Sequence, residues 1–206
     1  MNLHQLWLIT RYSFTEIWRN KTFRVAFMVL IPLLIAYQVS FQSDMFNIPV
    51  EYTLVLSSFI PTQNAYMFNL LLVFPLATMG FWVHKQKKYN TLEALLVHPQ
   101  GNDTYSTGFI LGIIIAFMIM GSISLALAGL INLFASPTSF QPLIYLFYLV
   151  TLFLPTIVFV VGITSFLAAR CFKNGTVTTF FMLVYLSVDI LFLSTLYHGL
   201  FDPLGI

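Results

Sequence analysis

Side chains that could carry acid–base chemistry are scarce in this sequence, and one of them has an apolar setting. Asp189, in YLSVDILFLS, is the only acidic residue inside a long apolar run. A carboxyl group inside a membrane is costly and often marks a path for protons or ions, which favours proton transfer as its role. The alternative is a structural Asp189 that forms hydrogen bonds with Ser187 or Ser194. The sequence leaves both interpretations open.

Motifs for metal binding, nucleotide binding and nucleophilic catalysis are absent. The sequence has no H-E-x-x-H, no G-x-x-x-x-G-K-[ST] and no G-x-S-x-G. Its four histidines lack the spacing of metal ligands: His4, His84, His98 and His198. A single cysteine, Cys171, excludes an internal disulfide and a cysteine-rich metal site. We expect no enzyme activity of this chain by itself, no catalytic residue, no metal and no cofactor of its own.

The composition requires a membrane environment. Of the 206 residues, 59% are hydrophobic and only 8% are charged, which is more apolar surface than a soluble domain of this size can bury. Nearly uncharged runs of helix-spanning length cover residues 23–41, 65–83, 106–134, 142–169 and 176–197. The sequence therefore predicts an all-α, polytopic helical bundle with about five membrane-spanning helices. It forms a single transmembrane domain over residues 1–206.

The basic residues predict the orientation, because short loops rich in Lys and Arg remain cytoplasmic. They precede the first run, follow the second and follow the fourth, so all of them fall on one side. These residues are Arg11, Arg19, Lys21, Arg24, Lys85, Lys87, Lys88, Arg170 and Lys173. The N-terminus is then cytoplasmic in a multi-pass protein of the cell membrane. Basic residues at a membrane surface favour contact with anionic lipid, and we expect no nucleic acid partner.

Residues 3–20 predict an amphipathic helix. On a helical wheel one side carries Leu3, Leu6, Trp7, Thr10, Phe14, Ile17 and Trp18, and the other carries His4, Gln5, Arg11, Thr15, Glu16 and Arg19. Two tryptophans and several basic neighbours favour a helix that lies in the cytoplasmic interface. The alternative is a helix that packs on other protein.

Two further patterns bear on helix packing. Small residues recur in the third run, at Gly108, Gly112, Ala116, Ser124 and Ala128. Such a face lets another helix approach closely, so it predicts the most tightly packed surface. Three runs hold a proline near the middle, namely Pro32, Pro75 and Pro155. Each proline removes a backbone hydrogen bond and is expected to kink its helix.

A polar stretch, VHKQKKYNTLEALLVHPQG, separates the second and third runs at residues 83–101. Asn90 suits an N-cap, Glu93 has the capping-box position, and Pro99 prevents continuation, so a short helix is predicted over residues 91–98. Its apolar side carries Leu92, Leu95 and Leu96. A helix this short needs a packing partner. That partner is the membrane interface, neighbouring helices or a soluble subunit.

The order of these elements resembles the permease subunits of type 2 ABC exporters. The shared order is an amphipathic helix, two spans, a short cytoplasmic helix reading NTLEALLVHP, and a Gly-containing third span after YSTGFILG. In that family the segment between the second and third spans, often similar to T-L-E-x-L-L-x-x-P, is the coupling helix that meets the ATPase. The residues that fit it are Thr91, Leu92, Glu93, Leu95, Leu96 and Pro99.

Two features depart from the family pattern. Gly112 is followed by Ile113, where the family often has a basic residue. Such permeases also have six spans with both termini inside, whereas five runs are present here. The expectation is either a sixth helix in a missing C-terminal part or a shortened relative.

The resemblance implies the membrane subunit of an ATP-driven exporter in a prokaryotic cytoplasmic membrane. A separate ABC ATP-binding subunit would bind the ATP, and a second permease half would complete a homodimer or heterodimer. No polar cluster in the runs indicates a substrate. Two alternatives stay open: a non-transporting membrane anchor or assembly protein that recruits a soluble partner, and a proton-coupled carrier that uses Asp189.

Overall fold

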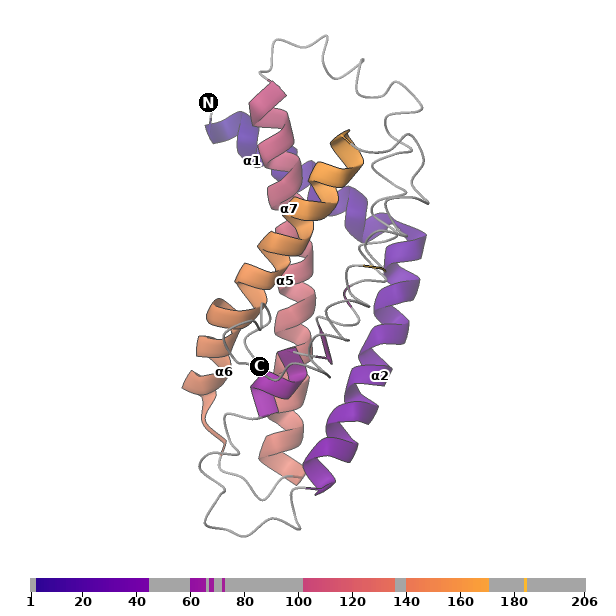
Figure 1. Cartoon of the computed structure of the whole chain (residues 1–206), viewed down its shortest axis with the longest axis vertical. Coiled ribbons are helices and arrows are strands. Elements are labelled where there is room, and N and C mark those ends of the chain that lie inside the picture. Colours follow the sequence, from indigo (N-terminus) through magenta and orange to yellow (C-terminus); the bar gives the residue numbers. More distant parts are fainter. Residues whose placement is uncertain are drawn as a thin grey trace. The chain divides into compact units, whose positions relative to one another are not determined.

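The structure, a computed structural model, describes residues 3–44, 60–65, 67–68, 72, 102–135, 140–170 and 184 (Figure 1). The elements are α1 (Leu3–Arg19), α2 (Lys21–Asp44), α5 (Asn102–Ala135), α6 (Pro142–Tyr148), the π-helix η3 (Leu149–Phe153) and α7 (Leu154–Arg170). Residues 60–65, 67–68, 72 and 184 are also helical, and no strand occurs among the described residues. The predicted all-α class is confirmed for this part of the chain.

Three stretches are long and apolar enough to cross a membrane. They are Phe23–Gln42 of α2, Thr104–Phe134 of α5, and Pro142–Phe166 across α6, η3 and α7. They correspond to the first, third and fourth predicted runs, so the chain is a multi-pass protein embedded in a membrane.

The other two predicted runs, 65–83 and 176–197, lie mostly outside the described residues. Helical structure is already present at residue 60, ahead of the start predicted for the second run. Gln63 and Asn64 interrupt the apolar pattern at this end, which is why hydropathy alone places the start later.

The chain divides into two compact units. Among the described residues, the first unit contains 3–26, 102–117, 157–170 and 184. The second contains 27–44, the helical residues between 60 and 72, 118–135 and 140–156. Helices α2, α5 and α7 therefore each contribute residues to both units.

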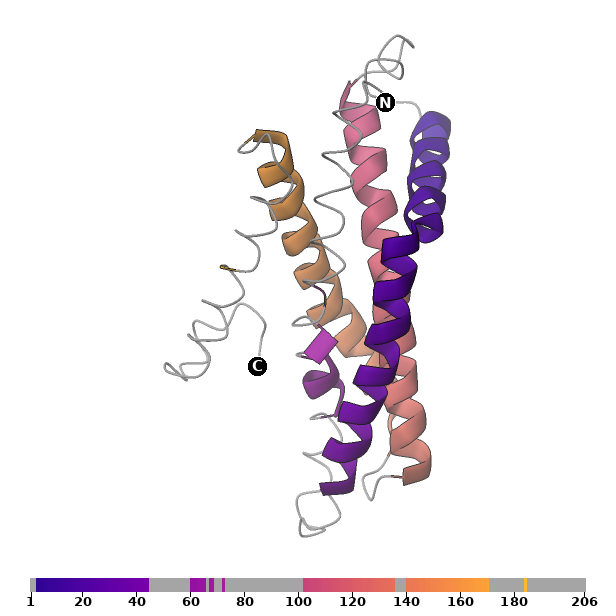
Figure 2. The ribbon, with the colours of Figure 1, turned by 90° about the vertical axis from the view of Figure 1, so that its right-hand side faces the viewer.

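In the first unit, α1 packs on the N-terminal part of α5, as Figures 1 and 2 both show. The glycines of α5 make this close approach possible. A Cβ atom on Gly112 would lie 2.8 Å from the Cβ of Ser13 and 2.9 Å from the carbonyl oxygen of Thr10. A Cβ on Gly108 would lie 2.9 Å from Cγ2 of Ile9. At Gly108 and Gly112 the predicted close-packed face of small residues is confirmed, and its partner there is the amphipathic helix.

The buried side of α1 coincides only in part with the apolar side of the helical wheel: Thr10 and Ile17 belong to both, and Ser13 belongs only to the buried side. The buried residues of α1 are Thr10, Ser13 and Ile17, whereas Leu3 and Trp7 are 75% and 60% exposed. The glycine face of α5 accepts short side chains best, because they allow the two backbones to approach. A helical wheel based on hydrophobicity does not take this preference for small side chains into account.

Aromatic rings hold the end of α1 to the start of α2 and to α5 in the same unit. Trp18 stacks on Phe14 at 5.8 Å between centroids, and Trp18 also lies 6.0 Å from Phe23. Phe23 meets Phe117 of α5 edge to face at 5.7 Å. Because Phe23 and Phe117 are both buried, these contacts fix where the first span begins relative to α5 within this unit.

A π-helical turn precedes the proline of the fourth predicted run. Helices α6, η3 and α7 run without a break from Pro142 to Arg170, and the N–H of Leu154 donates to the carbonyl oxygen of Leu149, five residues earlier. Pro155 follows directly and has no N–H to donate, so the wide turn accommodates the lost hydrogen bond. The sequence predicted a disturbance at Pro155 but not its π-helical form. Helix α2 continues through Pro32.

The core of the second unit contains a pair of packed aromatic rings. Phe153, in the π-helical turn, is fully buried and its ring lies 5.1 Å from that of Phe68. Gly121 of α5 makes room for it, since a Cβ there would lie 2.7 Å from Cδ1 of Phe153. The ring of Phe153, packed on Gly121, therefore holds the π-helical turn against α5.

Candidate functional site

The site residues predicted from the sequence lie outside the described residues. They are Thr91, Leu92, Glu93, Leu95, Leu96, Pro99 and Asp189. Their roles remain predictions. Among the residues that the structure does describe, no three His, Cys, Asp or Glu side chains gather as metal ligands.

The described polar residues that do come together lie on the C-terminal half of α5 and its neighbours in the second unit. Ser124, Ala128 and Asn132 follow one another at four-residue spacing and are all buried. Each step of four residues turns the helix by only about 40°, so these positions form a slowly rotating row. Successive members of the row therefore meet different neighbouring elements.

The first two positions of the row contact side-chain amides. Ser124 Oγ donates to Oδ1 of Asn64 at 3.0 Å. Nε2 of Gln42 donates to the carbonyl oxygen of Ala128 at 3.2 Å and to Oε1 of Gln38 at 3.1 Å. We refer to Gln38, Gln42, Asn64 and Ser124 as the amide cluster. It joins α2, residues 60–65 and α5 through uncharged hydrogen bonds.

The third position of the row holds α6. Nδ2 of Asn132 donates to the hydroxyl of Tyr145 at 2.8 Å, and both side chains are buried. The ring of Tyr145 also packs against Phe140 at 5.5 Å between centroids. A hydrogen bond between buried groups in a membrane helix bundle adds specificity to the packing of α6 on α5.

The amide cluster is not fully satisfied. Within the described residues, three of its buried atoms have no hydrogen-bond partner: Nε2 of Gln38, Oε1 of Gln42 and Nδ2 of Asn64. Leaving a polar atom buried without a partner costs about 1–3 kcal/mol, so a purely structural core would gain by replacing these amides with apolar side chains. Two donors and one acceptor without charge suit the hydrogen-bonding of a neutral polar group. They neither attract an ion strongly nor transfer a proton, because amides do not titrate.

The amide cluster was not predicted from the sequence, where no polar cluster in the apolar runs indicated a substrate. Two residue spacings in the sequence are consistent with the amide cluster. Gln38 and Gln42 lie four residues apart in the first span, and Ser124 and Asn132 lie eight apart in the third, so each pair shares a helix face. That the faces meet depends on tertiary packing, which hydropathy does not report.

Comparisons of the chain with protein families, with curated proteins and with solved structures found no match.

The contact between Ser124 and Asn64 predicts a measurable contribution to stability. We expect Ser124→Ala to lower the free energy of unfolding by about 1 kcal/mol, because Oδ1 of Asn64 loses its only donor in the described part of the chain. Ser122→Ala is the matched control, since the hydroxyl of Ser122 donates to the carbonyl oxygen of Met118 in its own helix. Unfolding of both variants in mixed lipid and SDS micelles would measure the difference. An equal loss in the two variants would contradict the contact as the cause.

Proposed function

We propose that this chain is the membrane-spanning permease subunit of an ATP-driven exporter, coupling ATP hydrolysis by a separate ABC ATP-binding subunit to the export of a substrate. The observation that carries the proposal is the order of elements around NTLEALLVHP. An amphipathic helix and a span precede this sequence, and a glycine-containing span follows it. Helices α1, α2 and α5 cover the residues where the resemblance expects them, which supports this order.

The proposed coupling depends on α5. Residues 91–98 would bind the ATPase, and α5 begins at Asn102, a few residues farther along the chain. A displacement of residues 91–98 on nucleotide closure would therefore be passed to the N-terminal end of α5. That end is in close contact with α1 through Gly108 and Gly112. Since α5 is one continuous helix to Ala135, the displacement would be transmitted along its length.

The amide cluster is the part of the described spans best suited to contact a polar substrate group. Its groups are neutral, and no Asp, Glu, Lys or Arg occurs in residues 104–134 or 142–166. We therefore propose that the exported molecule presents a neutral hydrogen-bonding group to these helices. Two permease halves would enclose the path. The N-terminus would lie in the cytoplasm, as the one-sided basic residues predict.

Truncating the apolar side of residues 91–98 tests the proposed coupling. We expect Leu95→Ala with Leu96→Ala to lower copurification of the ATPase about tenfold, because apolar contact contributes roughly 25 cal/mol per Å² of buried surface. Glu93→Ala should have a smaller effect, since one capping contact contributes about 1 kcal/mol or less. The measurement is the amount of a protein carrying G-x-x-x-x-G-K-[ST] that purifies with each variant from native membranes.

A matched pair of leucines at the other end of α5 provides the control. Leu130 and Leu133 are 51% and 54% exposed, and their double alanine variant removes the same side-chain atoms. Membrane levels of all variants must be equal for the comparison. Undiminished ATPase copurification with the Leu95 and Leu96 variant would refute the coupling role and leave these leucines as interfacial anchors.

A further inference from the structure

The exposed side of α1 carries a basic hollow that the proposed function does not use. Arg11, Thr15 and Arg19 are exposed and follow one another at four-residue spacing, so they form one row on the helix. Beside this row is a hollow of about 470 Å³, within the size range of small-ligand sites. Its lining residues are Leu8, Arg11, Tyr12, Thr15, Glu16 and Arg19.

The two guanidinium groups are available to an anion. In the part of the chain that the structure describes, no carboxylate forms an ion pair with Arg11 or Arg19. The Thr15 hydroxyl between them donates to the carbonyl oxygen of Arg11 at 2.8 Å, so its proton is already used. Glu16 contributes one negative charge to the lining against the two positive ones. The described lining residues therefore carry a net positive charge.

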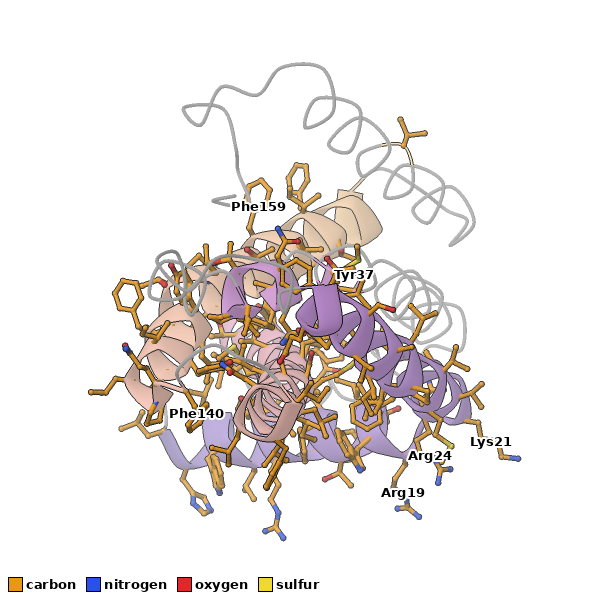
Figure 3. All side chains as sticks on the ribbon, turned by 90° about the horizontal axis from the view of Figure 1, so that it is seen from below. Arg19, Lys21, Arg24, Tyr37, Phe140 and Phe159 are labelled. Carbon is orange, nitrogen blue, oxygen red and sulfur yellow. The ribbon has the colours of Figure 1, made fainter. Side chains whose placement is uncertain are left out.

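More positive charge lies just beyond the hollow. Lys21 and Arg24 follow Arg19 at the junction with α2, and Figure 3 shows these three side chains projecting away from the ribbon. A guanidinium N–H of Arg24 donates to the carbonyl oxygen of Arg19 at 3.4 Å, which places Arg24 at the end of α1 rather than in the hollow. These two residues add attraction for anions without lining the hollow.

The position of the hollow in the sequence is at a membrane boundary. The apolar span of α2 begins at Phe23, four residues after Arg19. Leu8 and Tyr12, in the wall of the hollow, are 49% and 62% exposed, which is a large apolar exposure beside two arginines. A combination of basic and exposed apolar side chains next to a span is typical of contact with lipid headgroups and the adjoining acyl chains.

We propose that this hollow binds the headgroup phosphate of an anionic phospholipid. Guanidinium groups bind phosphate oxygens through paired hydrogen bonds, and both Arg11 and Arg19 line the hollow. A zwitterionic lipid would bring its ammonium group toward the same two guanidinium groups, which disfavours it. Free phosphate lacks the acyl chains that would cover Leu8 and Tyr12. The proposal is independent of the exporter function.

The test is lipid retention by the full chain, measured by native mass spectrometry after purification from mixed phosphatidylglycerol and phosphatidylcholine. We expect the native chain to retain phosphatidylglycerol preferentially. Surface charge alone contributes about a fivefold factor for each basic residue, which would give about a 25-fold loss for either pair of substitutions. R11Q with R19Q also removes the paired guanidinium hydrogen bonds, so it should weaken retention by clearly more than about 25-fold. The matched control, K21Q with R24Q, removes the same charge outside the hollow and should have a clearly smaller effect. R11K with R19K keeps the charge but loses the paired hydrogen bonds, and should fall between native and R11Q/R19Q.

Three outcomes would overturn the proposal. Equal losses in the two glutamine pairs would mean that diffuse surface charge, not the hollow, attracts the lipid. Displacement of phosphatidylglycerol by millimolar inorganic phosphate would mean that the site takes free phosphate. Full retention by R11K/R19K together with R11Q/R19Q would mean that these arginines do not bind lipid. Circular dichroism would show whether R11Q/R19Q folds. If it does not, R11K/R19K is the deciding variant. Native-like lipid retention by R11K/R19K would exclude paired guanidinium hydrogen bonds.

Discussion

Replacing Phe153 by alanine is expected to lower the free energy of unfolding by about 3–5 kcal/mol, the usual loss for removing a buried aromatic ring. The ring is fully buried and packs on that of Phe68 at 5.1 Å. Gly121 lies against it and has no side chain that could move into the space left behind. The cavity should therefore persist. The π-helical turn would lose its main contact with α5.

The control for this prediction is a phenylalanine on the same unit that is not buried. Phe134 of α5 is 81% exposed, so Phe134→Ala should change stability by only about 0.5 kcal/mol or less. Unfolding in mixed lipid and SDS micelles would compare the two variants. If both lose the same amount, or Phe153→Ala loses less than 1 kcal/mol, the ring does not hold the turn against α5.

Span positions could be predicted from the sequence because they depend on length and hydropathy alone. The predicted runs 23–41, 106–134 and 142–169 differ by only a few residues from Phe23–Gln42, Thr104–Phe134 and Pro142–Phe166. A bilayer imposes these bounds on any apolar helix, whatever its neighbours are. Amphipathic residues 3–20 were predictable for the same reason, and form α1 over Leu3–Arg19.

The packed faces of these helices could be predicted from the sequence only where the size of the side chains, rather than their polarity, determines the packing. The glycines of α5 predicted its packed face, because a missing Cβ permits close approach with any partner. That Ser13 rather than Trp7 would be buried against this face did not follow from a hydropathy pattern. The amide cluster was missed for a related reason. Gln38 and Asn64 lie on different segments, and only the packed structure places both next to α5.

The π-helical turn before Pro155 could also not be predicted from the sequence. A proline inside a helix removes one backbone hydrogen bond. The helix can accommodate this loss by a kink, by an inserted water molecule or by a wider turn. Here the turn over Leu149–Phe153 is π-helical, and it carries Phe153 into the space beside Gly121. Which of these three conformations the helix adopts depends on the contact between Phe153 and Gly121.

The contact of α1 with α5 leads to the last prediction, in which two chemically identical substitutions have opposite effects. Alanine has a higher helix propensity than glycine by about 1 kcal/mol, so Gly→Ala in a helix is stabilising wherever space permits. At Gly162 of α7 no described residue lies within 4 Å of the added Cβ, and Gly162→Ala should stabilise by up to about 1 kcal/mol. At Gly112 the added Cβ would lie 2.9 Å from the carbonyl oxygen of Thr10 and 3.0 Å from the amide nitrogen of Phe14. These are backbone atoms of α1, which cannot yield unless the helix itself moves.

Gly112→Ala should therefore destabilise the chain by about 1–3 kcal/mol despite its better helix propensity, as overpacked contacts usually do. The loss should be confined to the packing of α1 on α5, because the described atoms nearest to the added Cβ all belong to Thr10, Ser13 and Phe14 of α1. Hydrogen exchange separates this from general unfolding: protection of the amides of α1 should fall in Gly112→Ala while that of Met118 to Asn132 in α5 is retained. Gly162→Ala should leave both unchanged. If α1 keeps its protection in Gly112→Ala, its backbone does not rest on the glycine face, and the coupling route proposed through the N-terminal end of α5 would lose its anchor.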